Sequence, residues 1–240
     1  PNYLFIDLHI GSRAKAGTFD ISFTRQGKTV ESYGYEHKSR DQKASHHHGF
    51  NSGDAIYLIT PDRFANGNPA NDEVPTLEEG KNRDDKGGRH GGDIQGVIDH
   101  LDYIDRMGFS AIWLNPVLEN DMPHHSYHGY ATTDYYQVDA RMGSNELYKE
   151  LSEKANERGI KLIMDMIPNH CGSQHWWMKD LPMDNWVHYP DSFQVTNRRR
   201  TTVRDPHAAQ ADHKKFTDRW SISAMPDMNQ DNPLVAKYLI

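Results

Sequence analysis

Apolar, aromatic and β-branched residues near the start of the chain gather in runs with the composition typical of β-strands. The runs are Tyr3 to Ile10, Thr18 to Arg25 and Lys28 to His37, and Gln26-Gly27 favours a tight turn between the last two. Three strands are barely enough for an independent sheet. We therefore predict that residues 1–49 are the last strands of a β-sandwich domain and a linker.

A polar stretch from Ser39 to Gly53 follows these strands and is predicted to be the linker. It contains His46, His47 and His48, which raises the question of a metal site. Side chains of adjacent residues point in different directions, so an exposed linker explains the three histidines better.

From Ala55 onwards the pattern changes to short buried strands alternating with amphipathic helices. The predicted strands are Ala55 to Thr60, Ala111 to Leu114 and Lys161 to Ile167. Strands that alternate with helices are typical of parallel α/β architecture. We therefore predict two strand-helix-strand crossovers.

The helices of these crossovers have recognisable ends. Asp93 begins the first and Gly108 ends it, while Ser144 begins the second and Gly159 ends it. The stripe that each helix turns to the sheet is apolar, and its members are Ile94, Val97, Ile98, Leu101 and Ile104, then Leu147, Leu151 and Ala155.

Long polar segments follow the strands: Pro61 to Arg89, Asn115 to Gly143, and Asn169 to about Trp220. In parallel α/β folds these segments gather at the carboxyl ends of the strands and form the functional site. The third is too long for a loop, so we predict a small inserted domain at residues 171–220. Residues 50–170 precede it, and residues 221–240 return to the main domain and begin its third helix.

Aromatic and basic residues of the inserted segment allow two interpretations each. Trp176, Trp177 and Trp186 are either platforms for a sugar ring or packing residues within the domain. The run Arg198 to Arg200 is better explained as a solvated face than as a binding site.

Composition narrows the class of partner. A net charge of -7 argues against nucleic acid and anionic membrane surfaces, since both require a basic protein surface. No stretch approaches the ~20 apolar residues of a membrane span. The single cysteine, Cys171, excludes an intrachain disulfide.

Three polar motifs lie beyond the predicted strands: Asp165-Met-Ile-Pro-Asn169-His170, Tyr127-His-Gly-Tyr130 with Thr133-Asp134-Tyr135, and Met225-Pro-Asp-Met-Asn229. By itself the first motif is equally well explained by an acid that caps a loop. Together, the three resemble conserved regions of the α-amylase superfamily in their usual order. Pro61 to Asn68 resembles its neopullulanase and cyclomaltodextrinase branch.

The resemblance implies a (β/α)₈ TIM barrel with a domain inserted after its third strand, which cleaves α-glucosidic bonds with retention. It implies that Tyr130 stacks on the sugar ring and that His170 hydrogen-bonds the 6-hydroxyl, with His128 lining the same pocket. Asp134, Asp165 and Asn169 are expected to support the site.

The same resemblance places the nucleophilic Asp after the fourth strand and the acid/base Glu after the fifth. We therefore expect both catalytic residues after residue 240, and no catalytic residue within this span. The chain is interpreted as an N-terminal part that cannot hydrolyse a glucan alone.

A second group of residues is rich in oxygen. Its members are Asn66, Asn68, Asn71, Asp72, Gly91 and Asp93. Calcium prefers such amide, carboxylate and backbone oxygens, although loops are rich in Asn, Asp and Gly for backbone reasons as well. The family resemblance implies structural calcium at these positions, with Asn68 standing where an Asp is often found.

The expected function is therefore hydrolysis of starch-type glucans such as maltooligosaccharides, pullulan or cyclodextrins. Two alternatives stay open: a glycosyl transferase of the same superfamily, and a catalytically silent homologue used for sugar binding or assembly. We expect a periplasmic or extracellular location, with the cytoplasm as the alternative, and the sequence leaves a homodimer of the intact protein open.

Overall fold

The computed structural model describes residues 2–39 and 49–240 and divides into two compact units, one from Tyr3 to Gly49 and one formed mainly by Phe50 to Ile240. The predicted linker histidines His46, His47 and His48 lie outside the described residues. No helix in the described part is both long and apolar enough to cross a membrane.

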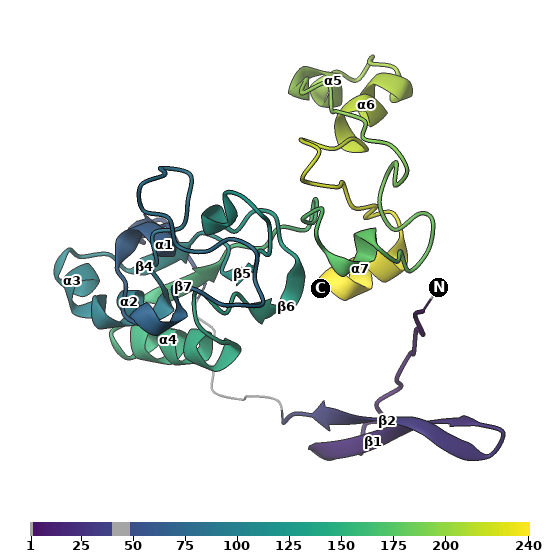
Figure 1. The fold of residues 1–240 in the computed structure, drawn as a ribbon, viewed down its shortest axis with the longest axis horizontal. Coiled ribbons are helices and arrows are strands. Elements are labelled where there is room, and N and C mark those ends of the chain that lie inside the picture. The colour runs from purple at the N-terminus through teal and green to yellow at the C-terminus, as the bar shows by residue number, and fades with distance from the viewer. Residues whose placement is uncertain (1, 40–48) are drawn as a thin grey trace. The chain divides into compact units, whose positions relative to one another are not determined.

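The first unit is built around an antiparallel hairpin of β1 (Gly17–Arg25) and β2 (Lys28–His37), as predicted (Figure 1). The turn uses Gln26 and Gly27, both with positive φ, as in the type I′ turns that are common in two-residue hairpin loops. The strand predicted from Tyr3 to Ile10 is wrong, because the described residues there form no strand. Strand-like composition alone does not make a strand, because strand geometry also depends on residues far away in the sequence.

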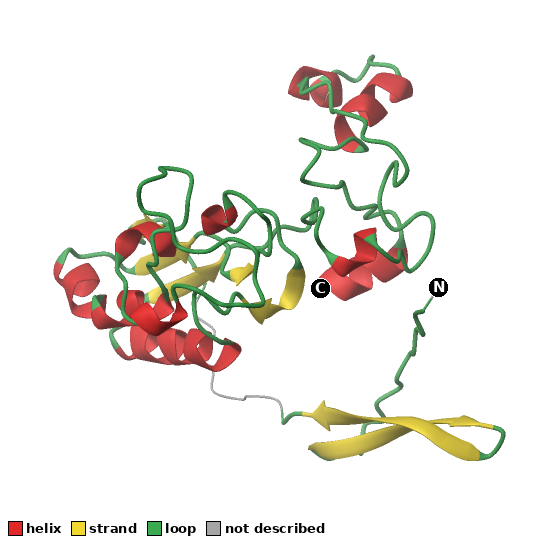
Figure 2. Ribbon diagram, in the orientation of Figure 1, coloured by secondary structure: helices red, strands yellow, loops and turns green. Residues whose placement is uncertain are grey.

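The second unit contains a parallel sheet in the order β3-β4-β7, formed by β3 (Ile56–Ile59), β4 (Ala111–Leu114) and β7 (Lys161–Met164). Helices α2 (Ile94–Asp99), α3 (Leu101–Arg106) and α4 (Asn145–Glu157) make the two crossovers, as predicted (Figures 1 and 2). The first crossover helix is broken at His100, whose φ of -111° and ψ of 14° depart from helical values.

Apolar helix faces and one face of the sheet form the core. Its fully buried members include Ile94, Val97, Leu101, Ile112 and Leu151. Burying each such side chain stabilises the fold by roughly 1.5–3 kcal/mol. The opposite face of the sheet is open in the described structure, where Ile56, Leu58 and Trp113 are 46%, 55% and 38% exposed.

Helix caps explain where these elements begin. The Asp93 carboxylate accepts from Gly96 N, and the Ser144 hydroxyl accepts from Leu147 N. Gly108 and Gly159 have positive φ and directly follow the C-caps of α3 and α4, where these helices end.

The remaining elements lie in the loops and the inserted segment. The loop after β4 contains an unpredicted antiparallel pair, β5 (Leu118–Glu119) and β6 (Asp134–Val138). Short helices complete the chain: α1 (Pro61–Phe64), η2 (Pro69–Asn71), η3 (Ser126–His128), η4 (Trp176–Met178), α5 (Arg200–Arg204), α6 (Gln210–Thr217) and α7 (Pro233–Leu239).

Candidate functional site

A tight turn in the loop after β4 places His128 and Tyr130 beside each other. Gly129 between them has a φ of +80°, and a Cβ on it would lie 2.0 Å from the carbonyl oxygen of Pro116. Only glycine fits this turn without displacing the backbone. Tyr130 N donates to His128 Nδ1 at 2.9 Å, and the two rings lie 5.8 Å apart.

The predicted strand from Lys161 to Ile167 included Asp165. In the structure β7 ends at Met164, so Asp165 lies directly after the strand. Its Oδ2 accepts two hydrogen bonds, from Tyr130 OH at 3.1 Å and from Trp113 Nε1 at 3.0 Å. Trp113 pairs with Ile163 in the neighbouring strand, so the register brings its indole to the acid two residues further on.

His170 is fixed through both ring nitrogens and its carbonyl. Nε2 lies 2.8 Å from the carbonyl oxygen of Tyr130, and Nδ1 lies 3.2 Å from Asn169 Nδ2. This network fits the tautomer in which Nε2 donates to Tyr130 and Nδ1 accepts. The hydroxyl of Tyr135 donates to the carbonyl oxygen of His170 at 2.6 Å, which anchors the backbone as well.

Burial controls the protonation of this group. Burial lowers the pKa of His170, and the hydrogen bond to the Tyr130 carbonyl partly opposes this shift. Burial also lowers the pKa of His128, and the nearby His125 lowers it further. Burial and the adjacent Asp165 raise the pKa of the Tyr130 hydroxyl. At neutral pH the group therefore offers two neutral imidazoles and a protonated phenol.

A second layer links this group to the motif after the inserted segment. Asn169 Nδ2 donates to Asp227 Oδ1 at 3.3 Å, and His188 Nδ1 lies 2.8 Å from Asp227 Oδ2. A β-bridge also pairs His170 with Asp227. The structure thus joins the motif of Asp165 to the motif of Asp227 through backbone and side chains.

Asp134 lies apart from these contacts. Its carboxylate accepts from Tyr136 N at 2.7 Å at the start of β6.

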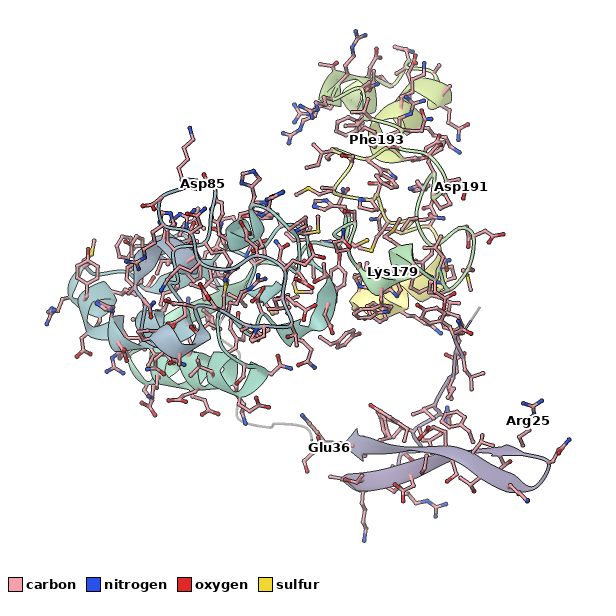
Figure 3. All side chains as sticks on the ribbon, viewed as in Figure 1. Arg25, Glu36, Asp85, Lys179, Asp191 and Phe193 are labelled. Atoms are coloured by element: carbon pink, nitrogen blue, oxygen red, sulfur yellow. The ribbon has the colours of Figure 1, made fainter. Side chains whose placement is uncertain are left out.

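Among the aromatic residues of the inserted segment, Trp177 and Trp186 are 2% and 1% exposed, which favours the packing interpretation. Trp176 is 41% exposed and keeps both interpretations. In Figure 3, labels mark Lys179, Asp191 and Phe193 of this segment, and Phe193 packs near Trp220 with ring centroids 5.8 Å apart.

The oxygen-rich residues cluster in the loop that follows β3, whose outer part is labelled at Asp85 in Figure 3. Asp72 is buried; its Oδ1 accepts from Asn66 Nδ2 at 2.6 Å, and its Oδ2 pairs with Lys81 Nζ. A Cβ on Gly91, where φ is +87°, would lie 2.4 Å from Asp72 Oδ1. This places the Gly91 backbone against the same carboxylate.

Two of the predicted ligands have buried oxygens without a hydrogen bond. Asn66 Oδ1 and Asn71 Oδ1 are inaccessible to solvent, and neither accepts a hydrogen bond from the residues described (2–39 and 49–240). An unsatisfied buried acceptor is costly, so each needs a partner such as water or a cation. These two oxygens and Asp72 therefore fit a calcium site.

The other two predicted ligands already hold backbone groups. Asn68 Oδ1 accepts from Ala70 N, and the Asp93 oxygens accept from Gly67 N, Asn68 N and Gly96 N. The described residues contain no group of three or more His, Cys, Asp or Glu side chains placed to hold a metal. Any cation would therefore be held mainly by amide and backbone oxygens.

The sequence analysis did not predict three residues that contact the candidate sites in the structure: Trp113, Lys81 and His188. Trp113 carried a weak signal, since the indole N–H of a tryptophan in a strand often finds an acceptor, although its side chain is 38% exposed in the described structure. The other two carry no local signal, because their partners lie nine and 39 positions away.

Comparison with known proteins agrees with these features. Residues 58–240 match the family model described as the alpha amylase catalytic domain, and residues 1–41 match the model described as the N-terminal part of cyclomaltodextrinase. Neopullulanase 2 from Thermoactinomyces vulgaris is 33% identical over 192 residues, and the alignment covers 77% of this chain and 30% of the relative.

Cyclomaltodextrinase from Thermoanaerobacter pseudethanolicus is 34% identical over 194 residues, with 77% of this chain and 30% of the relative covered. The solved structure of an alpha-amylase from Geobacillus thermoleovorans in complex with acarbose aligns with a TM-score of 0.59 at 36% identity, over 78% of this chain and 35% of that one. The chain thus spans about a third of the length of these relatives. On these grounds the chain belongs to the alpha-amylase family.

Proposed function

We propose that the protein is a retaining glycoside hydrolase that cleaves α-glucosidic bonds of starch-type glucans. The parallel sheet β3-β4-β7 would be the first three strands of a (β/α)₈ barrel, and the missing strands would cover its open face. Residues 171–220 would be the domain inserted after the third strand. Substrate classes named for the relatives, such as cyclomaltodextrin, support this choice.

The observation that carries the proposal is the carboxylate of Asp165, held at the strand ends by two neutral donors. Neutral donors fix its position without cancelling its charge. A negative charge near the sugar stabilises the positive charge that develops on the ring in an oxocarbenium-like transition state. The Tyr130 ring beside it supplies the flat surface on which a sugar would stack.

His170 has a more specific role in this proposal than direct contact with a sugar hydroxyl. Both of its ring nitrogens are engaged within the protein, one with the Tyr130 carbonyl and one with Asn169. We therefore propose that His170 acts first by positioning Tyr130. A hydrogen bond to the 6-hydroxyl would require the ring to release one of these partners.

The nucleophile and the acid/base are proposed to follow residue 240. A retaining site needs two carboxyl groups about 5 Å apart on either side of the glycosidic bond. Residues 1–240 alone are accordingly expected to be inactive. The open face of the sheet is expected to make them associate with themselves or with the segment that follows.

Product analysis of the full-length protein on pullulan, soluble starch and cyclodextrin tests the function. We expect reducing sugars from at least one substrate, with retention of the anomeric configuration by NMR. Longer products formed from maltotriose would instead identify a glycosyl transferase. Binding without any bond cleavage would identify a silent homologue and contradict the proposal.

We also propose structural calcium in the loop after β3, which would be held by Asn66, Asn71, Asp72 and the Gly91 backbone. Asn68 and Asp93 would shape the site through the backbone groups that they hold. Bound calcium would satisfy the buried amide oxygens and tie this loop to the start of α2. Thermal melts with and without a chelator measure this effect, and an unchanged melting temperature would contradict it.

A further inference from the structure

Both oxygens of the buried Asp72 carboxylate are engaged by other side chains of this loop. The Asn66 amide donates to Oδ1 at 2.6 Å, and the Lys81 ammonium pairs with Oδ2. The Asp72 side chain is only 4% exposed, whereas that of Lys81 is 38% exposed. Asp72 is thus a fixed buried charge, and Lys81 is a counter-charge that reaches it from the solvent side.

The backbone of Lys81 is held in place for this contact. Lys81 forms a β-bridge with Arg89, and Asn82 N donates to the Arg89 carbonyl at 2.8 Å. The flexible part of the residue is therefore its four-carbon side chain, while its Cα is fixed beside the site. Such a side chain can leave the carboxylate without disturbing the loop.

The oxygens near Asp72 favour a cation of higher charge. Asn66 Oδ1 and Asn71 Oδ1 are buried and accept nothing from the part of the chain that the structure describes. An ammonium bonded to Asp72 Oδ2 leaves these two acceptors unsatisfied, whereas calcium can contact several oxygens at once. An ammonium and a divalent ion repel each other strongly at such short range, so they cannot share the carboxylate.

We propose that Lys81 and calcium compete for Asp72, so that Lys81 sets the calcium affinity of this loop. Without calcium, Lys81 neutralises the buried acid and keeps the loop folded. With calcium, the Lys81 side chain moves into solvent and the ion contacts Asp72, Asn66 and Asn71. This inference rests on the calcium proposal above but assigns a new role to a residue outside the ligand set.

Calcium titration of the chelator-stripped full-length protein tests the inference, with calorimetry to measure affinity and thermal melts to measure stability. Lys81→Met removes the competing charge and keeps the length of the side chain. We expect it to bind calcium about tenfold more tightly than the wild type, because ligand charge tunes the affinity of such sites. We also expect a lower melting temperature without calcium, which saturating calcium restores.

Lys154→Met is the matched control. Lys154 pairs with Glu150 on the exposed face of α4 at 2.6 Å, so its loss changes the net charge equally at a distant place. Its calcium affinity should equal that of the wild type. Lys81→Gln repeats the test with a polar side chain if the methionine variant does not fold, and Lys81→Arg, which keeps the charge, should show no gain.

The outcomes separate this inference from the calcium proposal. Calcium binding by the wild type with the same affinity in the Lys81 variants would overturn the competition and leave calcium in place. No calcium binding by any variant would overturn both. Binding by Lys81→Met alone would support the competition and overturn structural calcium in the wild type, since the wild-type lysine would then exclude the ion.

Discussion

The two ends of the β3-β4-β7 sheet each hold a carboxylate, but they hold it in opposite ways. At the amino end, Asp54 accepts from Lys161 Nζ at 2.7 Å and from the Ser110 hydroxyl at 2.9 Å. At the carboxyl end, Asp165 accepts from the neutral groups of Trp113 and Tyr130. In the described structure, no salt bridge reaches Asp165.

This difference separates a contact that stabilises from one that is available for chemistry. Lys161 neutralises Asp54 and ties the start of β7 to the residues before β3, so little charge is left for a ligand. Asp165 has no counter-charge among its hydrogen-bond partners and lies beside the half-buried Tyr130. Parallel barrels in general have a stability face and a catalytic face, and the proposed function assigns the amino end to the first and the carboxyl end to the second.

The largest effect should come from removing the Tyr130 ring. For the proposed activity of the full-length protein, Tyr130→Ala should lower kcat by about a hundredfold, because stacking is expected to strengthen as the sugar flattens towards the transition state. KM should change less. Steady-state kinetics on a maltooligosaccharide measure both constants.

Tyr130→Phe is the control, since it keeps the ring and removes only the hydroxyl that donates to Asp165. Because this variant loses one donor to Asp165 but keeps the stacking surface, we expect its kcat to fall by about tenfold, well short of the loss in Tyr130→Ala. A turnover number for Tyr130→Ala equal to the wild-type value would show that the carboxyl end is not the catalytic face.

A smaller effect is expected from the second donor on Asp165. Trp113→Phe keeps an aromatic ring in β4 but loses the indole N–H. A hydrogen bond to a charged group contributes about 1.5–3 kcal/mol, so loss of the lower amount would reduce kcat about tenfold if the bond matters to the transition state. Thermal melts serve as the control. If the loss of kcat is accompanied by a lower melting temperature and is the same for every substrate, the indole only stabilises the fold.

Elements that follow local patterns could be predicted from the sequence. Ser144 caps α4, Leu151 and Ala155 lie on its buried stripe, and Gly159 ends the crossover, since each feature depends only on near neighbours. The segment from Tyr3 to Ile10 has strand-like composition but forms no strand. The geometry of a strand depends on residues far away in the sequence, which a local pattern does not specify.

In the candidate site, too, the features that follow from local patterns were predictable and the non-local contacts were not. Tyr130, His170 and Asp165 were brought to one place by the topology of parallel strands, which the alternation of helix and strand made predictable. The hydrogen-bond assignments were not predictable. The two nitrogens of His170 turn to the Tyr130 carbonyl and to Asn169 because of backbone geometry across 40 residues.

The amino end should respond in stability and not in turnover. Lys161→Met should lower the melting temperature by a few degrees and leave kcat unchanged. Lys161 is also the main reason that the pKa of Asp54 is lowered to about 2. An acid with a lowered pKa stabilises the fold above its unfolded pKa, near 3.8, and loses this contribution as the pH falls towards 2.

Thermal melts at pH 7 and at pH 2.5 check this expectation. The difference between wild type and Lys161→Met should be large at pH 7 and shrink at pH 2.5. A loss of kcat in Lys161→Met at a temperature where it is fully folded would contradict the division between the two ends.

The smallest expected effect concerns the layer behind the carboxyl end, where His188 pairs with Asp227. The hydrogen bond to Asp227 raises the pKa of His188, and burial raises the pKa of Asp227 against the effect of His188 and Asn169. A raised histidine pKa stabilises the fold fully below the unfolded value, about 6.5, and this contribution disappears as the pH rises through the folded value. The raised pKa of Asp227 sets the acid limit of the window, since the pair needs an ionised carboxylate.

His188→Gln tests this contribution, because glutamine can still donate to Asp227 but carries no charge. The melting temperature of the wild type should exceed that of the variant by a few degrees near pH 5.5, and this difference should be smaller at pH 8. Since the amino end responds only in strong acid, this response between pH 5.5 and 8 would belong to the carboxyl end alone. A constant margin across that range would mean that folding does not raise the pKa of His188, and that the pair with Asp227 contributes no charge-dependent stability.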